Sequence, residues 1–251
     1  AWDRAAELYR RALDILDGAG LEAVPERWHA LVNLHITLRS RGRLAESLPL
    51  LEAAEEAARA SGDEGARVFL ENARGQLCMV RGDPEGAEAR FRTALESLSG
   101  PGAAGARITV RLNLAEALLA RDRLLDAAET IREAEMEAIA ARVLPRLPEV
   151  YRLLGRVAAA RGDADAFVLF ERALELVRDH HLPTVEEART LQAYAEAEAA
   201  RGEAGTAELL RDRALARYRE VGIEHPRHPW GEYFAPQDSD DPSPQHGGPH
   251  D

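Results

Sequence analysis

An all-α fold is the architecture that this sequence predicts, with antiparallel helix pairs stacked as a right-handed α-solenoid. The first observation is a step of arginine followed by glycine or aspartate that recurs every 40 positions. A fixed period of about 20–50 residues is typical of stacked repeats. The second observation is a composition dominated by alanine, leucine, glutamate and arginine, which favour helix. Together they predict about five and a half helix pairs over residues 1–222.

Each step is expected to be the turn between the first and the second helix of one pair. The five steps are Arg41-Gly42, Arg81-Gly82, Arg121-Asp122, Arg161-Gly162 and Arg201-Gly202. In four of the five first helices, the residue seven positions before the turn glycine or aspartate is small, as a close helix crossing requires. These five positions hold His35, Gly75, Ala115, Gly155 and Ala195.

The second helices carry a small, a large and a small residue at spacings of four and three, which places all three on one helix face. Examples are Ala87, Phe91 and Ala94 in one pair and Ala166, Phe170 and Ala173 in another. In the last pair the same register gives Ala207, Arg211 and Ala214. The small residues allow a neighbouring helix to approach, and the large residue fills the space beside them.

Helix boundaries are predicted from capping residues. Asp83 and Pro84 supply an N-cap and a first-turn proline for one second helix. Thr184 and Glu187 have the spacing of a capping box. Pro49 lies several residues into a second helix, so that helix either starts late, near Ser47, or bends at the proline.

These patterns resemble the tetratricopeptide repeat (TPR) family over about residues 2–222. The pair that matches best carries Gly75, Cys78, Gly82, Ala87, Phe91 and Ala94 at the family's positions. The period is 40 residues rather than the common 34 or so, and the usual proline after the second helix is missing. Such long repeats are similar to those in sensor modules of bacterial transcription activators and in kinesin light chains.

The two ends of the array differ in character. Ala5, Tyr9 and Ala12 repeat the small-large-small triad, so the chain is expected to open with a lone second helix. We interpret this as a fragment of a longer protein, with an atypical N-terminal cap as the alternative. In the last pair, Glu198 and Arg211 replace apolar or small residues, and the register predicts an ion pair between them.

Residues 223–251 have another composition and are expected to form an acidic, proline-rich, disordered tail. They contain six of the 13 prolines, six acids and one arginine. Their aromatic cluster of Trp230, Tyr233 and Phe234 is expected to fold back onto the last pair or to act as a short recognition motif.

The clearest candidate site is the concave face formed by the first helices, where polar residues point away from the packing between helices. The register places nine residues there: Asn33, Asn72, Gln76, Asn113, Glu116, Arg152, Arg156, Arg189 and Gln192. Amides can bond a peptide backbone, and arginine matches carboxylate. In the TPR family such concave residues bind peptide tails. Asn33 and Asn113 have counterparts there, whereas the lysines of the family's carboxylate clamp have none here.

The sequence therefore predicts a non-catalytic scaffold module that binds a protein or peptide, as part of a larger regulatory protein. The alternative is a ligand- or peptide-sensing module of a bacterial transcription activator. No lysine is present, which excludes a P-loop, a kinase site and a pyridoxal phosphate Schiff base. No catalytic motif or cofactor site is recognisable, so no enzyme activity is expected.

Charge and cysteine content limit the partners and the compartment. The net charge of -12 argues against nucleic acid and anionic lipid as partners. Cys78 is the only cysteine, which excludes an internal disulfide and suits the reducing cytoplasm. No apolar run is long enough to span a bilayer.

The histidines are expected to be structural. His35 is interpreted as a packed core residue, and His180 and His181 as residues at a helix end. Four tail histidines could bind stray metal, but a flexible chain has no preset geometry. No metal site is therefore predicted.

Overall fold

The computed structural model describes residues 2–39 and 43–223, which contain α-helices and short 3₁₀ turns and no β-strand. Helix α1 spans Trp2–Gly18. Five hairpins follow: α2 (Pro25–Arg39) with α3 (Leu44–Ser61), α4 (Ala66–Val80) with α5 (Pro84–Glu96), α6 (Ala104–Ala120) with α7 (Leu124–Ala140), α8 (Leu147–Ala160) with α9 (Ala166–Asp179), and α10 (Thr184–Ala200) with α11 (Ala204–Glu220). The 3₁₀ turns η1 (Pro101–Ala103) and η2 (Leu144–Arg146) precede α6 and α8.

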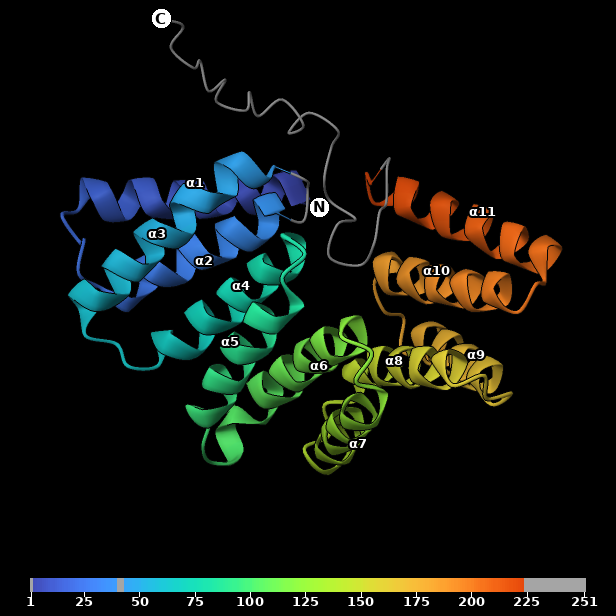
Figure 1. Cartoon of the computed structure of the whole chain (residues 1–251). Coiled ribbons are helices and arrows are strands. Elements are labelled where there is room, and N and C mark those ends of the chain that lie inside the picture. Colours follow the sequence, from blue (N-terminus) through green and yellow to red (C-terminus); the bar gives the residue numbers. More distant parts are fainter. Residues whose placement is uncertain (1, 40–42, 224–251) are drawn as a thin grey trace, which may run out of the picture.

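The hairpins follow one another along a curved path, as Figure 1 shows. The most extensive packing lies within each hairpin, and α2, α4, α6, α8 and α10 also contact one another in that order. We call these five the inner helices. The prediction of an all-α chain in which neighbouring helices pack together is confirmed.

The turns within the hairpins are built alike. Gly82, Asp122, Gly162 and Gly202 all have positive φ, between 57° and 89°. Residues 40–42 lie outside the described residues, so the φ of Gly42 is not compared. In all five turns a backbone amide bonds the carbonyl five residues earlier, which satisfies a carbonyl left open at the helix end. These bonds are Arg43 to Leu38, Asp83 to Cys78, Arg123 to Leu118, Asp163 to Ala158 and Glu203 to Glu198.

The predicted small residues allow the two helices of a hairpin to approach closely. A Cβ atom added at Gly75 would lie 2.5 Å from the ring of Phe91, and one at Gly155 would lie 2.8 Å from the ring of Phe170. Both rings are fully buried. The glycines therefore leave the space that each phenylalanine fills.

Three local predictions are corrected by the structure. Leu210 is buried and Arg211 exposed, so the large residue of the α11 triad is Leu210. The predicted ion pair of Glu198 with Arg211 is absent from the described contacts, because Arg211 faces solvent while Glu198 pairs with Arg201 at 3.4 Å. Thr184 makes no capping hydrogen bond, because it is already the first residue of α10.

The positions at which α3 and α5 begin agree in part with the prediction. Asp83 caps α5, since its carboxylate accepts a hydrogen bond of 2.8 Å from the amide of Gly86. Helix α3 starts at Leu44 and contains Pro49, so the late start near Ser47 is wrong. The first helix, α1, packs on α2 through Ala6, while Leu8 and Ile15 are exposed.

Ile223, the first residue of the predicted tail, lies against the last hairpin. Ile223 is 6% exposed and packs with Tyr218 against α10. The rest of the predicted tail, with the predicted fold-back of Trp230, Tyr233 and Phe234, lies outside the described residues.

His35 is a packed core residue, as predicted. Its imidazole is fully buried, and its Nδ1–H donates to the carbonyl of Ser47 at 2.8 Å. Its pKa is lowered from 6.5 to about 4, mainly by burial and to a smaller extent by nearby Arg39, against the hydrogen bond to Ser47, which raises it. The ring is therefore neutral near pH 7.

Acidification should destabilise the chain through His35. Below pH 6.5 the unfolded histidine binds a proton that the folded one binds only near pH 4. The stability that the neutral ring contributes is therefore present above pH 6.5 and is lost as the pH falls through this window. From pH 7 to pH 5 we expect the free energy of unfolding to fall by about 2 kcal/mol from this residue. Urea unfolding of His35→Ala should show a pH dependence smaller by that amount, and equal pH dependence in both proteins would refute the assignment.

Candidate functional site

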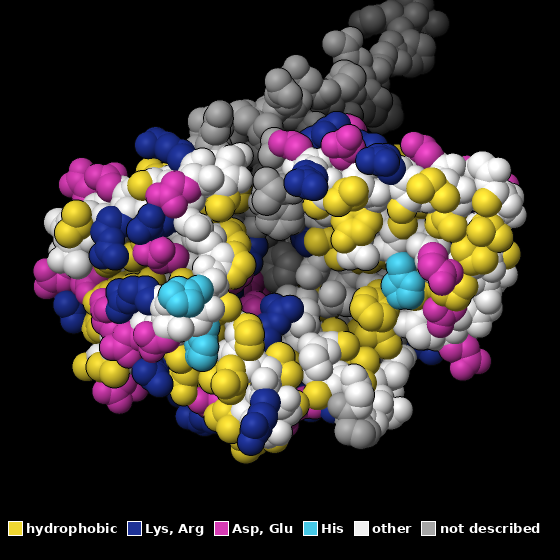
Figure 2. Space-filling view, turned by 180° about the vertical axis from the view of Figure 1, so that it is seen from behind, with side chains coloured by type: hydrophobic (Ala, Val, Ile, Leu, Met, Phe, Trp, Pro, Cys, Tyr) yellow, Lys and Arg dark blue, Asp and Glu magenta, His cyan; other side chains and the backbone are white. Residues whose placement is uncertain are grey.

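The candidate site is a cavity of about 390 Å³ on the inner side of the curved array. Each of the five inner helices contributes to its wall, and η2 adds one residue. Figure 2 shows the molecule hollowed between its two ends. Seven of the nine predicted site residues line this cavity: Asn33, Asn72, Gln76, Asn113, Glu116, Arg152 and Arg189.

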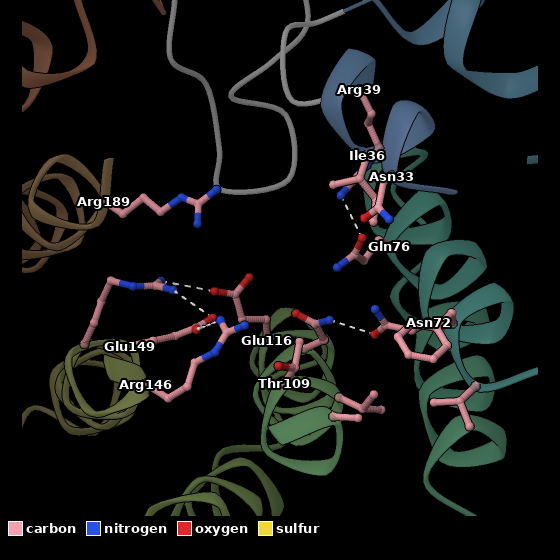
Figure 3. A pocket seen from close by; sticks show the side chains of 16 residues that line it. Asn33, Ile36, Arg39, Asn72, Gln76, Thr109, Glu116, Arg146, Glu149 and Arg189 are labelled. Carbon is pink, nitrogen blue, oxygen red and sulfur yellow. Dashed lines mark hydrogen bonds and ion pairs between the residues drawn. The ribbon is translucent and has the colours of Figure 1, made fainter. Parts of the chain in front are cut away.

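One end of the cavity holds a buried ion-pair network. Arg152 on α8 is 2% exposed, and its Nη1 donates to Oε1 of Glu116 on α6 at 3.1 Å. Its Nη2 lies 3.7 Å from Oε1 of Glu149, which also pairs with Arg146 at 3.2 Å. Arg189 on α10 lies on the same side of the cavity in Figure 3 and pairs with Glu186 at 3.1 Å.

Opposing influences set the protonation of these carboxyl groups. Burial acts to raise the pKa of Glu116, but Arg152, Arg156 and Arg189 outweigh it and hold that pKa below its usual value. Glu116 is therefore charged and attracts the arginines around it. In Glu149, burial raises the pKa and Glu186 raises it further, against Arg146 and Arg152.

The middle of the cavity and its other side carry amide side chains. Nδ2 of Asn113 donates to Oδ1 of Asn72 at 2.8 Å, which joins α6 to α4. Oε1 of Gln76 accepts from Arg39 at 2.7 Å, which joins α4 to α2. These bonds orient the amides toward the cavity, as Figure 3 shows for Asn72 and Gln76. Asn33 is exposed at the rim, where its Nδ2 donates to the carbonyl of His29 at 2.8 Å.

An apolar wall faces the arginines, and the sequence analysis did not identify it. It consists of Ile36, Val68, Phe69, Ala106 and Val110. Phe69 is 46% exposed, and its ring lies 5.5 Å from that of Trp28 and 6.0 Å from that of His29. Its spacing of three from Asn72 on α4 is the signal that could have revealed it, because that spacing shares a helix face.

Two predicted site residues lie outside the cavity wall. Arg156 is one helical turn beyond Arg152 and reaches Glu116 at 3.8 Å, so it supports the network from behind. Gln192 accepts a hydrogen bond of 2.8 Å from the hydroxyl of Tyr218, which links α10 to α11. The sequence analysis did not identify three charged residues that also line the cavity. They are Arg39, Arg146 and Glu149.

The cavity is cationic although the chain is acidic. Four arginines and two glutamates line it, a formal charge of +2, while the whole chain carries -12. A concave surface lined by one sign of charge raises the local concentration of ligands that carry the opposite sign. The cavity is therefore suited to a ligand that carries negative charge.

No group of three histidine, cysteine, aspartate or glutamate side chains that could hold a metal ion is present among residues 2–39 and 43–223. Within the same residues, no helix has both the length and the apolar character required to cross a bilayer. His180 lies at the C-terminal end of α9, as predicted, and the four tail histidines lie outside the described part.

Comparison of the chain with protein-family models gives no match, and comparison with curated proteins gives none either.

Proposed function

We propose that the chain is a TPR-like right-handed α-solenoid of about five and a half repeats whose inner surface binds a protein or peptide. In this proposal it is a non-catalytic scaffold module of a larger regulatory protein in the cytoplasm. The observation that carries the proposal is the cavity to which all five inner helices contribute. Eleven of its 16 lining residues are polar or charged, which suits a peptide backbone and its acidic groups better than an apolar ligand.

A second candidate is a sensing module that takes a small ligand or signalling peptide, as in bacterial transcription activators. The volume of about 390 Å³ and the apolar wall support it, because small-molecule sites are about 300–1,000 Å³ and largely apolar. The polar majority of the lining favours the scaffold function.

Capture of partners by two protein variants tests the proposed function. Arg146→Ala with Arg189→Ala removes two cavity arginines, each of which forms an i,i+3 ion pair with a glutamate. We expect this double variant to recover about tenfold less of any partner that binds through the inner surface. The reason is that hydrogen bonds to charged groups contribute about 1.5–3 kcal/mol each. The measurement is quantitative mass spectrometry of proteins that co-purify from a lysate of the native cell.

The matched control is Arg43→Ala with Arg172→Ala, which breaks two i,i+3 pairs outside the cavity. Partners that need the inner surface should remain with this control. Unchanged recovery with the cavity variant would remove the inner surface from consideration.

A further inference from the structure

The cavity has two chemically different ends, and this limits what can fill it. Arg146, Arg152 and Arg189 lie at one end, on η2, α8 and α10. The apolar wall lies on α2, α4 and α6, and the amides of Asn72, Gln76 and Asn113 lie on α4 and α6 beside it. Figure 3 shows Arg146 and Arg189 on one side, with Asn72 and Ile36 on the other.

The arginine end has an unused donor. Nε of Arg152 is buried and has no hydrogen-bond partner among the described residues, whereas the Nη groups pair with Glu116 and Glu149. A guanidinium has five N–H donors, and a buried donor left unbonded is unfavourable. A ligand carboxylate at this end would lie beside Arg146 and Arg189, which also line the cavity.

The apolar end has an unused surface. Phe69 is 46% exposed although Trp28, which packs against it, is 1% exposed. Val68 and Ile36 extend this wall into the cavity. Apolar surface of this kind is covered favourably by an apolar or aromatic side chain.

We propose that the occupant is an internal segment of a partner protein that carries an acidic residue and, a few residues away, an aromatic residue. The acidic side chain binds at Arg146, Arg152 and Arg189, and the aromatic ring covers Phe69 and Val68. The segment's backbone bonds the amides of Asn72 and Asn113. This proposal rests on the proposed function and adds the chemistry of the peptide to it. The net charge of +2 on the lining matches an acidic segment.

Calorimetric titration of the full chain with four synthetic peptides tests this pairing. The parent is acetyl-Phe-Ser-Ser-Asp-Asp-amide, whose blocked ends leave the side chains as its only charges. The others replace the aspartates by asparagine, the phenylalanine by alanine, or both. We expect the parent to bind most tightly and each single replacement to weaken it about tenfold, because each removes one end of the recognition.

Variants of the protein assign each preference to one end of the cavity. Arg189→Gln should reduce the preference for aspartate over asparagine and retain that for phenylalanine over alanine. Phe69→Ala should do the reverse. Arg172→Gln and Val168→Ala change an exposed ion pair and an exposed apolar residue outside the cavity, so both preferences should remain. Ratios measured within one variant are insensitive to a small loss of folded protein.

Equal affinity for all four peptides, or no binding by any of them, would overturn the proposed pairing. If Arg146→Ala with Arg189→Ala still lost a captured partner in that case, protein binding at the inner surface would stand with a different ligand chemistry. Preferences that Arg189→Gln and Phe69→Ala leave unchanged would place the peptide elsewhere and also overturn the inference.

Discussion

Replacing Glu116 with alanine is expected to lower the free energy of unfolding by about 3–5 kcal/mol. Its carboxylate is 6% exposed and lies 3.1 Å from Arg152, which is 2% exposed. Removal of the carboxylate leaves the guanidinium buried with Glu149 as its remaining close partner, at 3.7 Å. An uncompensated buried charge is far more costly than a lost surface ion pair.

Urea unfolding of two further variants separates this effect from general damage. Glu175→Ala breaks an exposed i,i+3 pair with Arg172 and should cost less than about 1 kcal/mol. Glu116→Ala combined with Arg152→Met removes both charges and should recover part of the loss, because the buried cation is gone. A loss for Glu116→Ala as small as that for Glu175→Ala would show that the pair is solvated rather than buried.

Replacing Gly75 with leucine is expected to destabilise the chain by about 3 kcal/mol or more, since even a Cβ would lie 2.5 Å from the buried ring of Phe91. The ring belongs to α5 and is fully buried against α4, so it cannot move away without disturbing the packing of this hairpin. This loss should exceed the gain of about 1 kcal/mol that leucine brings over glycine inside a helix.

Two comparisons identify the cause. Gly105 in α6 has no atom within 4 Å of an added Cβ, so Gly105→Leu should cause no loss. Phe91→Ala alone should cost about 3–5 kcal/mol. In the Gly75→Leu background the same change should cost much less, because leucine then occupies the space of the ring. Additive losses in the double variant would contradict direct packing between the two positions.

The helical hairpins could be predicted because their signals are local. A turn that requires positive φ selects glycine or aspartate, and a close helix crossing selects a small residue opposite a large one. Gly82, Gly75 and Phe91 follow these rules, and the structure places each as predicted. Arg211 does not follow them: it is exposed, and Leu210 is buried against α10 instead.

The candidate site could be predicted only where it follows helical register. Asn72, Asn113 and Arg152 occupy equivalent faces of successive inner helices, so the repeat placed them together. Arg146 lies in a 3₁₀ turn before α8, outside any helical register. Phe69 is an apolar residue of the kind usually found in a core, but it is 46% exposed. That exposure depends on which side chains lie beside it in the fold, and the sequence does not show this.

Genes that encode such a chain can grow or shrink in units of 40 codons. The bond from Asp83 to Cys78 recurs from Arg123 to Leu118, so a duplication or loss between these points rejoins equivalent backbone. No new turn has to evolve, and each event adds or removes one inner helix. Recombination within the gene could therefore alter the length of the inner surface while leaving every remaining junction intact.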